Sequence, residues 1–291
     1  MEKKENVFLA VLLTLLSSLC YAGLIALTKY LQLGLNSNVI VLFRYGVTFF
    51  LFVPYLFFFN KPATKTEVPK KHFIRSVFGF LGLVTTIVAT RYIPVPDAIL
   101  LSNTYPLFLP FIVWIHEKKM ITKQMSFGIL FGFLGIALIL KPTGHVMEPW
   151  SLIALGSGLL TALTMTYVRE LSKTESISQI NFQFLFYSFI FAIAFFLIDF
   201  QKPTLAQLPG LLAIGLIGTI YQQSFLWALK FAHSIIVAPI FYSSIVFGAL
   251  IEWNLYGTLP ELATLIGCLF VVLGATITVV LAGQSKHLSS K

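Results

Sequence analysis

The sequence has 291 residues, of which 57% are hydrophobic and only 11% are charged, and its mean hydropathy is +0.88. Because about a quarter of the residues in a soluble domain are charged, this composition excludes a soluble enzyme, a disordered chain and a secreted module. A lipid bilayer is the solvent that disfavours charge to this degree. The two cysteines, Cys20 and Cys268, lie inside apolar runs and indicate neither a disulfide framework nor a metal site.

Ten segments without Asp, Glu, Lys or Arg predict transmembrane helices, since crossing a bilayer takes about 20 mostly apolar residues. These predicted spans cover residues 7–28, 45–60, 76–90, 98–116, 124–140, 149–168, 176–198, 203–229, 231–251 and 262–285. The third segment is the shortest and needs its apolar neighbours to reach bilayer thickness. The remaining residues suffice only for loops and tails. We therefore predict an all-α membrane protein with ten transmembrane helices.

The distribution of positive charge predicts how these helices are oriented. Lys3 and Lys4 before an apolar run resemble a secretory signal, but the run continues to Tyr30 and is long enough to be the first span. Fifteen Lys and Arg residues fall in the tails and loops of one side and four in the loops of the other. Positive charge collects on the cytoplasmic side, so we expect a multi-pass inner (plasma) membrane protein with both termini in the cytoplasm. The same bias explains the net charge of +9 without a nucleic-acid partner.

The two halves of the sequence align with each other at a nearly constant offset, which predicts an internal duplication. The aligned pairs include Ala22 with Ala162, Gly79 with Gly218, Gly128 with Gly267 and Gly135 with Gly274. We predict a first repeat at 6–141, a second at 149–282, and cytoplasmic tails at 1–5 and 283–291. Each repeat holds five spans, and an odd number places the second copy upside down. Inverted repeats are typical of transporters with a substrate site near the membrane midplane.

Polar side chains near the centres of spans are the candidates for that site, because in lipid they face the interior of the bundle. Asn103 in the fourth span and Tyr242 in the ninth correspond under the offset between the halves, and both lie near prolines that free backbone carbonyls. Gln222 in the eighth span is favoured over Gln223, which points about 100° away. Hydrogen bonding between helices explains the same residues without a substrate.

Three further residues complete the predicted substrate cavity. Tyr21 and Thr164 lie in the corresponding first and sixth spans, although a threonine in a membrane helix often bonds its own backbone. Arg44 is the one clearly intramembrane charge. Two interpretations are open: it has a role in transport, or its side chain extends to the outer membrane surface. Acidic residues lie at the ends of predicted spans and form no buried proton relay, so coupling to an ion stays open.

Several motifs are absent from the sequence. No Gly-Lys dipeptide occurs, so the chain lacks a Walker A loop and any transport is secondary or facilitated. The histidines are scattered, and we predict no metal site, no cofactor and no enzymatic activity. GxxxG-type glycines such as Gly128 and Gly132 indicate close helix packing, within the chain or in a homodimer.

The stretch Arg91-Tyr92-Ile93-Pro94-Val95-Pro96-Asp97-Ala98, Ala238-Pro239 with Tyr242, and Gly257-Thr258-Leu259-Pro260 before Gly267 and Gly274 resemble the ten-helix EamA-type branch of the drug/metabolite transporter (DMT) superfamily. The resemblance implies a central cavity lined by spans one, three, four, six, eight and nine. Tyr21, Asn103, Thr164, Gln222 and Tyr242 are compatible with that cavity. Where many members have a glutamate, this chain has Thr258, which puts the role of an acidic pair with Glu117 in doubt.

Together these features predict a secondary transporter of small organic metabolites, such as amino acids or related compounds, that works by alternating access. The resemblance also extends to S-adenosylmethionine uptake carriers. A passive channel and a membrane scaffold without turnover are the alternatives from other classes. A channel is expected to have a continuous polar stripe along several spans, whereas the polar residues here cluster at mid-depth, which favours a closed binding site. The expected partners are a small-molecule substrate and the lipid bilayer, and a coupling ion such as a proton and a homodimer are compatible with the sequence.

Overall fold

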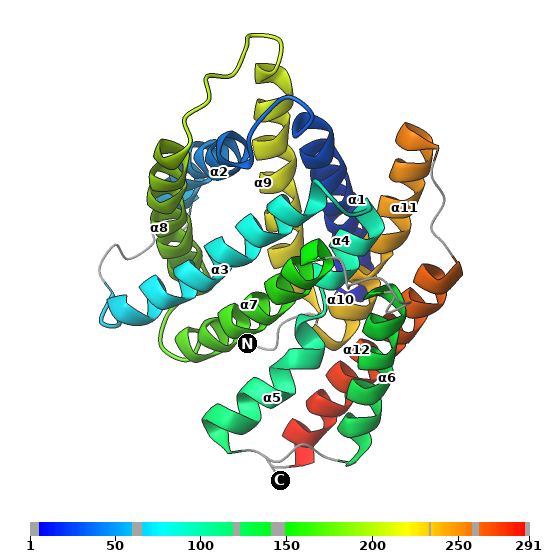
Figure 1. Ribbon diagram of the computed structural model, residues 1–291. Coiled ribbons are helices and arrows are strands. Elements are labelled where there is room, and N and C mark those ends of the chain that lie inside the picture. The colour runs from blue at the N-terminus through cyan, green and yellow to red at the C-terminus, as the bar shows by residue number, and fades with distance from the viewer. Residues whose placement is uncertain are drawn as a thin grey trace.

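The computed structural model describes residues 6–59, 66–118, 123–140, 149–232, 234–257 and 262–288, and within these ranges all regular secondary structure is α-helical (Figure 1). The helices are α1 (Val7–Leu31), α2 (Ser37–Phe59), α3 (Pro69–Thr90), α4 (Val95–Ser102), α5 (Tyr105–Glu117), α6 (Lys123–Leu140), α7 (Pro149–Leu171), α8 (Ile177–Ile198), α9 (Leu208–Phe231), α10 (Ser234–Phe241), α11 (Ser243–Tyr256) and α12 (Leu262–Leu288). The predicted tail at 1–5, the last three residues of the tail at 283–291, and Thr258 lie outside the described residues.

The prediction of an all-α membrane protein is confirmed. Seven helical stretches are long and apolar enough to cross a membrane, and the described part of the chain adds three shorter apolar helices at Ser37–Phe52, Ser126–Leu138 and Leu265–Ile277. Each of the ten predicted spans coincides with one of these. The fourth and ninth spans are broken, however, because α4 stops before α5 and α10 stops before α11.

The helices of the two halves start at equivalent points along the chain. Helix α2 begins at Ser37 and α8 at Ile177, and helix α6 begins at Lys123 and α12 at Leu262, so both pairs keep the offset of the sequence alignment to within one position. The broken helices α4 and α10 follow the same rule. The internal alignment of the sequence therefore corresponds to a repeated order of helices.

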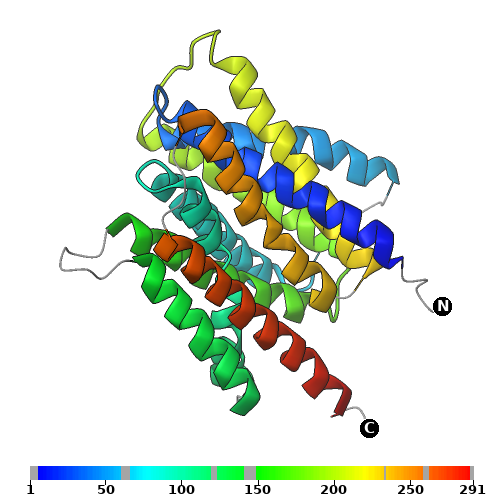
Figure 2. The same ribbon diagram turned by 90° about the vertical axis from the view of Figure 1, so that its right-hand side faces the viewer.

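Helices of the first half pack mainly on helices of the second. The extensive contacts join α1 to α9, α2 to α8, α3 to α7 and α6 to α12. Figures 1 and 2 both show α6 and α12 side by side at one edge of the bundle. The centre of the molecule thus lies between the two halves, and α6 with α12 lies outside it.

Paired glycines explain how closely α6 and α12 approach. A Cβ atom added to Gly135 would lie 2.5 Å from the Gly267 carbonyl oxygen, and one added to Gly274 would collide with the backbone at Gly128 and Gly132. Only glycine permits this distance between two helices. Because Gly128 corresponds to Gly267 and Gly135 to Gly274, each half contributes equivalent glycines. These glycines serve packing within the chain.

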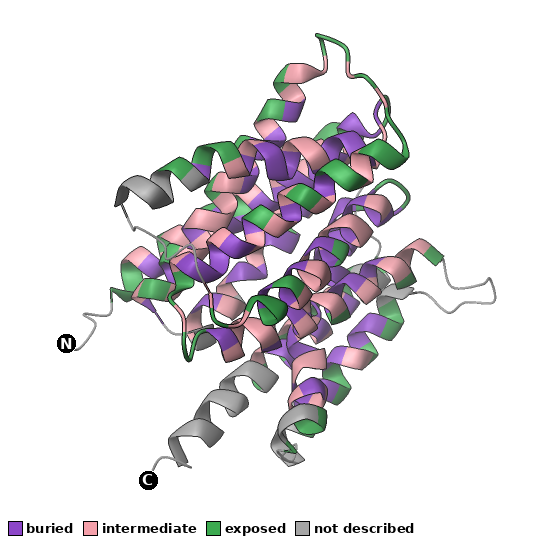
Figure 3. Ribbon diagram, turned by 90° about the vertical axis from the view of Figure 1, so that its left-hand side faces the viewer, coloured by how far each residue is buried: buried purple, intermediate pink, exposed green. Residues whose placement is uncertain are grey.

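Helix α1 shows why the bundle suits a bilayer. The exposed side chains Phe8, Leu12, Leu16 and Leu19 are all apolar and recur every three or four residues, which places them on one face of the helix. The opposite face is polar and buried, with Thr14, Ser17 and Ser18 all 0% exposed. Figure 3 shows exposed residues along the outer faces of the helices and buried ones between them. Apolar residues outside and polar residues inside are the arrangement that a lipid solvent stabilises.

Candidate functional site

The break between α4 and α5 follows from the local sequence. Pro106 lacks the N–H group that would bond a carbonyl of the preceding turn and continue α4 into α5. Instead, three consecutive side chains bond the carbonyls of the last turn of α4: Ser102 Oγ donates to Ile99 O (3.1 Å), Asn103 Nδ2 to Ile99 O (2.7 Å) and Thr104 Oγ1 to Leu101 O (2.7 Å). These side-chain bonds add to the backbone bonds that Ile99 O and Leu101 O accept from the N–H groups of Asn103 and Thr104, so the last turn of α4 is hydrogen bonded up to the break.

The second break, at Tyr242 between α10 and α11, meets the first. The Tyr242 hydroxyl donates to the Asn103 carbonyl oxygen at 3.1 Å, and Tyr242 is only 6% exposed. The two residues are 139 positions apart, which matches the offset of the repeats. The structure therefore brings two of the predicted site residues together, at equivalent points of the two halves.

Tyr21 joins the same cluster from α1. Its hydroxyl is hydrogen bonded to Ser102 Oγ at 3.0 Å, and its ring lies 5.0 Å from the ring of Tyr221 and 5.6 Å from that of Phe241, measured between centroids. Ser18 Oγ donates to the Phe241 carbonyl at 3.2 Å. Helices α1, α4, α9 and α10 therefore converge on one buried, partly aromatic centre.

The sequence analysis did not identify Ser17, Ser18 or Phe241 as part of this centre. Ser17 Oγ donates to the carbonyl of Tyr221 at 3.1 Å. The available signal was the spacing of Ser17, Ser18 and Tyr21, which places all three on one helix face. Phe241 carried no such signal, since lipid-facing phenylalanines are common in so apolar a chain.

Two other predicted residues lie differently. Thr164 is buried, but its Oγ1 donates to the Leu160 carbonyl of its own helix at 2.9 Å. This backbone bond is the alternative to a substrate role that the sequence left open. Gln222 is half-buried, and no hydrogen bond joins its side chain to another described residue. The neighbouring Gln223 has a buried Nε2 without a hydrogen-bond partner in the described part of the chain.

Arg44 is buried in the bundle and does not extend to the membrane surface, because only 4% of it is exposed. Nη1 donates to Thr48 Oγ1 at 2.6 Å and Nη2 to the Gly218 carbonyl at 3.2 Å. The side chain borders a gap that is too narrow for a water molecule. The other residues around this gap are Leu24, Ile25, Thr28, Leu83, Ile87 and Ile214.

The two halves are also linked at the end of the bundle where α1 finishes. Lys29 Nζ lies 2.9 Å from Glu252 Oε1 and 3.1 Å from the carbonyl of Ile93. The second carboxylate oxygen of Glu252 accepts from the N–H of Val95, at the first turn of α4. Glu252 is one of the acidic residues at the ends of predicted spans, yet it is buried, at 5% exposed. We call these contacts the Lys29 cluster.

A second set of contacts links the halves at the opposite end. Lys71 Nζ lies 2.9 Å from Glu170 Oε2, and His72 Nε2 lies 2.5 Å from Glu175 Oε2. Thr66 Oγ1 also donates to Glu175. We call these contacts the Lys71 cluster.

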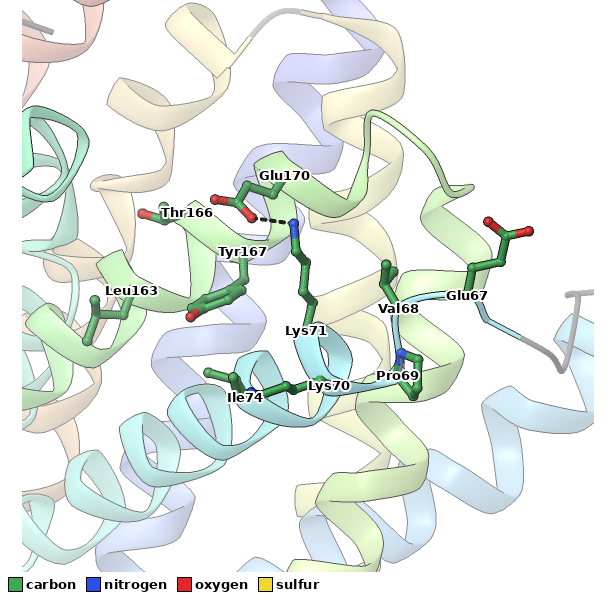
Figure 4. Close-up of a pocket in the computed structure, with 10 residues that line it drawn as sticks. All are labelled: Glu67, Val68, Pro69, Lys70, Lys71, Ile74, Leu163, Thr166, Tyr167 and Glu170. Atoms are coloured by element: carbon green, nitrogen blue, oxygen red, sulfur yellow. Dashed lines mark hydrogen bonds and ion pairs between the residues drawn. The ribbon is translucent and has the colours of Figure 1, made fainter. Parts of the chain in front are cut away.

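A cavity of about 480 Å³ adjoins the Lys71 cluster, between the first turn of α3 and the last turns of α7. Figure 4 shows Lys71 and Glu170 pointing toward one another across it. Its lining consists of Glu67, Val68, Pro69, Lys70, Lys71, Ile74, Leu163, Thr166, Tyr167 and Glu170. This cavity therefore contains none of the predicted site residues. This cavity could not be predicted from the sequence, because its charged residues lie at the ends of predicted spans, where charged residues are common.

No group of three or more His, Cys, Asp and Glu side chains in the described part of the chain is arranged to hold a metal ion. The chemistry of the centre is that of hydroxyl, amide and guanidinium groups. Such groups bind and orient a polar molecule by hydrogen bonds.

Helices that expose apolar side chains around a closed polar centre define a polytopic membrane protein of the transporter type. The profile of the EamA-like transporter family matches residues 8–141 and again 148–280. The chain therefore belongs to the EamA-like transporter family, within the DMT superfamily.

Similar proteins agree with this assignment. The chain is 24% identical over 269 residues to the S-adenosylmethionine uptake transporter of Rickettsia bellii (strain RML369-C), covering 91% of this chain and 90% of that protein. It is 28% identical to the pseudopaline exporter CntI of Pseudomonas aeruginosa (strain UCBPP-PA14), over 90% and 93% of the two chains. It is 26% identical to a riboflavin transporter of Vibrio cholerae serotype O1, over 94% and 93%. These are transporters of small metabolites and not enzymes.

A solved crystal structure has the same fold, with a TM-score of 0.66 at 15% identity, over 94% of this chain and 98% of the other. At this identity the likeness concerns the fold alone. It extends across both halves of the chain.

Proposed function

We propose that this protein is a secondary transporter that carries small organic metabolites, such as amino acids or related compounds, across the inner membrane by alternating access. The two repeats, 6–141 and 149–282, would rock against each other around a site formed at the helix breaks. Both termini would lie in the cytoplasm. The observation that carries the proposal is the hydrogen bond between Tyr242 and Asn103, which joins the two breaks at equivalent positions of the repeats.

Symmetry explains why such a contact suits transport. Two inverted units can exchange conformations, so that a site between them opens first to one side and then to the other. Broken helices supply free backbone groups near mid-depth, where continuous helices have none. At the first break of this bundle the Asn103 carbonyl turns toward the other half, where it accepts from Tyr242.

The two polar clusters fit the role of gates. The Lys29 cluster joins α1 and α4 to α11, and the Lys71 cluster joins α3 to α7 and the segment that follows it. Each cluster thus links a residue before 142 to one after 148. In the proposed orientation the Lys29 cluster closes the outer end and the Lys71 cluster the cytoplasmic end. Rocking would separate one set of contacts while the other stays formed.

The substrate and its direction of movement belong to the proposal. Related proteins are named for uptake of S-adenosylmethionine and for export of pseudopaline, so likeness alone does not fix a direction. An S-adenosylmethionine-type uptake carrier is the alternative that the first of these supports. A passive channel is disfavoured because the gap beside Arg44 does not admit a water molecule.

Counterflow into proteoliposomes tests the proposal. Vesicles containing the purified protein are loaded with unlabelled amino acids or S-adenosylmethionine, and uptake of the labelled compound is followed. We expect saturable uptake that depends on the internal load and falls at least about tenfold in Asn103→Leu, a change of about 1.4 kcal/mol. A smaller loss is expected for Gln222→Leu.

Asn254→Leu is the matched control, because Asn254 is exposed near the end of α11. It makes the same substitution away from the centre and should leave uptake unchanged. Uptake that rises linearly with concentration, with or without an internal load, would show a channel. No difference from protein-free vesicles for any compound would support a scaffold.

A further inference from the structure

Arg44 is a buried charge without a countercharge. It is 4% exposed, and none of the ion pairs formed by the described residues includes it. Its Nε is also buried without a hydrogen-bond partner among those residues. A charge that is neither solvated nor neutralised in a membrane protein is energetically unfavourable, so its presence indicates a function.

The groups around Arg44 satisfy part of its hydrogen-bonding capacity and none of its charge. Thr48 and the Gly218 carbonyl accept one hydrogen bond each. The phenol groups that interact with it electrostatically belong to Tyr21, Tyr45 and Tyr221. All of these are neutral. The guanidinium group therefore keeps a net positive potential, and three of its five N–H donors have no hydrogen-bond partner in the described part of the chain.

The second repeat shows that the fold does not need an arginine here. Arg44 packs on Gly218, where a Cβ atom would collide with the guanidinium group. In the other half the equivalent contact joins Gly79 to Phe184, and Phe184 occupies the position that corresponds to Arg44 in the second repeat. An uncharged ring thus performs the same packing. In the second half the guanidinium group beside the equivalent position is that of Arg75, 4.4 Å from the Phe184 ring. Packing on the glycine therefore does not account for the arginine at position 44.

Arg44 is also placed to touch a molecule held between the repeats. It lies two turns into α2, about 10 Å along the helix at about 1.5 Å per residue. The gap beside it is lined by α1, α2, α3 and α9, so both halves of the chain contribute. Tyr21, about one turn before Leu24 and Ile25 on α1, is hydrogen bonded to Ser102 at the first helix break. Widening the gap would put Arg44 and the breaks around one ligand.

We propose that Arg44 binds a carboxylate of the transported molecule, and that the substrates are therefore small metabolites that bear a carboxylate, amino-acid-like compounds among them. A guanidinium group holds a carboxylate through paired, charge-assisted hydrogen bonds. The carboxylate would use the free donors and neutralise the charge only while substrate is bound. The inference rests on the transport function proposed above and adds to it the chemical class of the substrate.

A competition among matched compounds tests this class. Proteoliposomes are incubated with an equimolar mixture of methionine and methioninamide, S-adenosylmethionine and its decarboxylated form, and riboflavin, and their contents are measured by mass spectrometry. Within each pair the members differ in the carboxylate. We expect at least about tenfold more of the carboxylate-bearing member, which corresponds to about 1.4 kcal/mol. Equal accumulation within the pairs, or accumulation of riboflavin alone, overturns the inference and leaves the transport function standing.

Variants assign the preference to Arg44. In Arg44→Gln we expect the ratio within each transported pair to fall to about one, while Arg44→Lys retains part of it. Arg75→Gln is the control, because Arg75 is also buried, at 7% exposed, and lies 4.4 Å from the ring of Phe184. It should leave the ratio unchanged even if the rate falls. A preference that survives Arg44→Gln overturns the inference, and accumulation of no compound by the wild type overturns the transport function itself.

Discussion

Lys29 Nζ lies 2.9 Å from Glu252 Oε1, and this pair joins the end of α1 to the end of α11, 223 residues apart. The Glu252 side chain is 7% exposed and that of Lys29 is 21% exposed, so water screens the pair poorly. The same carboxylate accepts from the first turn of α4. One acidic residue of the second half therefore holds two elements of the first.

We predict that Glu252→Gln weakens closure at this end, because it removes the charge that pairs with Lys29. Hydrogen bonds to charged groups contribute about 1.5–3 kcal/mol. Ser18→Cys, in the centre, should then react faster with a membrane-impermeant thiol reagent added outside. The exchanged pair Lys29→Glu with Glu252→Lys should restore slow labelling. Equal labelling rates in all variants would argue against a gate.

We predict that Pro106→Ala raises the stability of the protein and lowers its transport activity. The substitution returns an N–H to the chain and favours a continuous helix through Asn103. We expect a higher melting temperature in detergent together with lower transport. Pro209→Ala should change neither, because Pro209 is also in the first turn of its helix but the preceding helix α8 already ends at Ile198, too far away to continue into α9. A variant of Pro106 that melts lower than the wild type would contradict this account of the break.

Tyr21→Phe removes only the hydroxyl that is bonded to Ser102. The loss of a buried partner costs about 1–3 kcal/mol, so the melting temperature should fall. Tyr92→Phe serves as the control, because Tyr92 is 49% exposed and its ring would still stack on Trp150. Should both variants melt at the same temperature, the Tyr21 bond would have no stabilising role.

Gly135→Leu should separate α6 from α12. The new side chain would overlap the backbone at Gly267 and Val271, and overpacking of this kind costs about 1–3 kcal/mol or more. We expect poor recovery of folded protein by size-exclusion chromatography. Gly156→Leu is the matched control, since a Cβ atom at Gly156 meets nothing within 4 Å.

The orientation is tested with reporter fusions. Fusions at either terminus should be active with a cytoplasmic reporter, and a fusion at residue 145 should be active only with a periplasmic one. Equal orientation of α1 and α7 would contradict the inversion of the repeats.

The number, order and duplication of the helices could be predicted because they depend on apolar length and periodicity, which a single sequence displays. Asn103 and Tyr242 were predicted for the same reason, since the offset between the halves places them at one depth. The sequence does not display which polar residue faces which. The bond between Lys29 and Glu252, and the missing countercharge of Arg44, depend on how helices rotate and pack, and single-chain periodicity leaves that rotation undetermined.

The contact between α6 and α12 has a consequence for the history of such a chain. Each half contributes both a glycine without a side chain and the backbone that packs against such a glycine, since Gly135 contacts Gly267 and Gly274 contacts Gly128. In the inverted duplication proposed above, a half-length ancestor carrying these glycines would have had the means to join a second copy of itself inserted in the opposite sense. Fusion of two such genes would preserve the seam and free the remaining helices to diverge, as Arg44 and Phe184 have done.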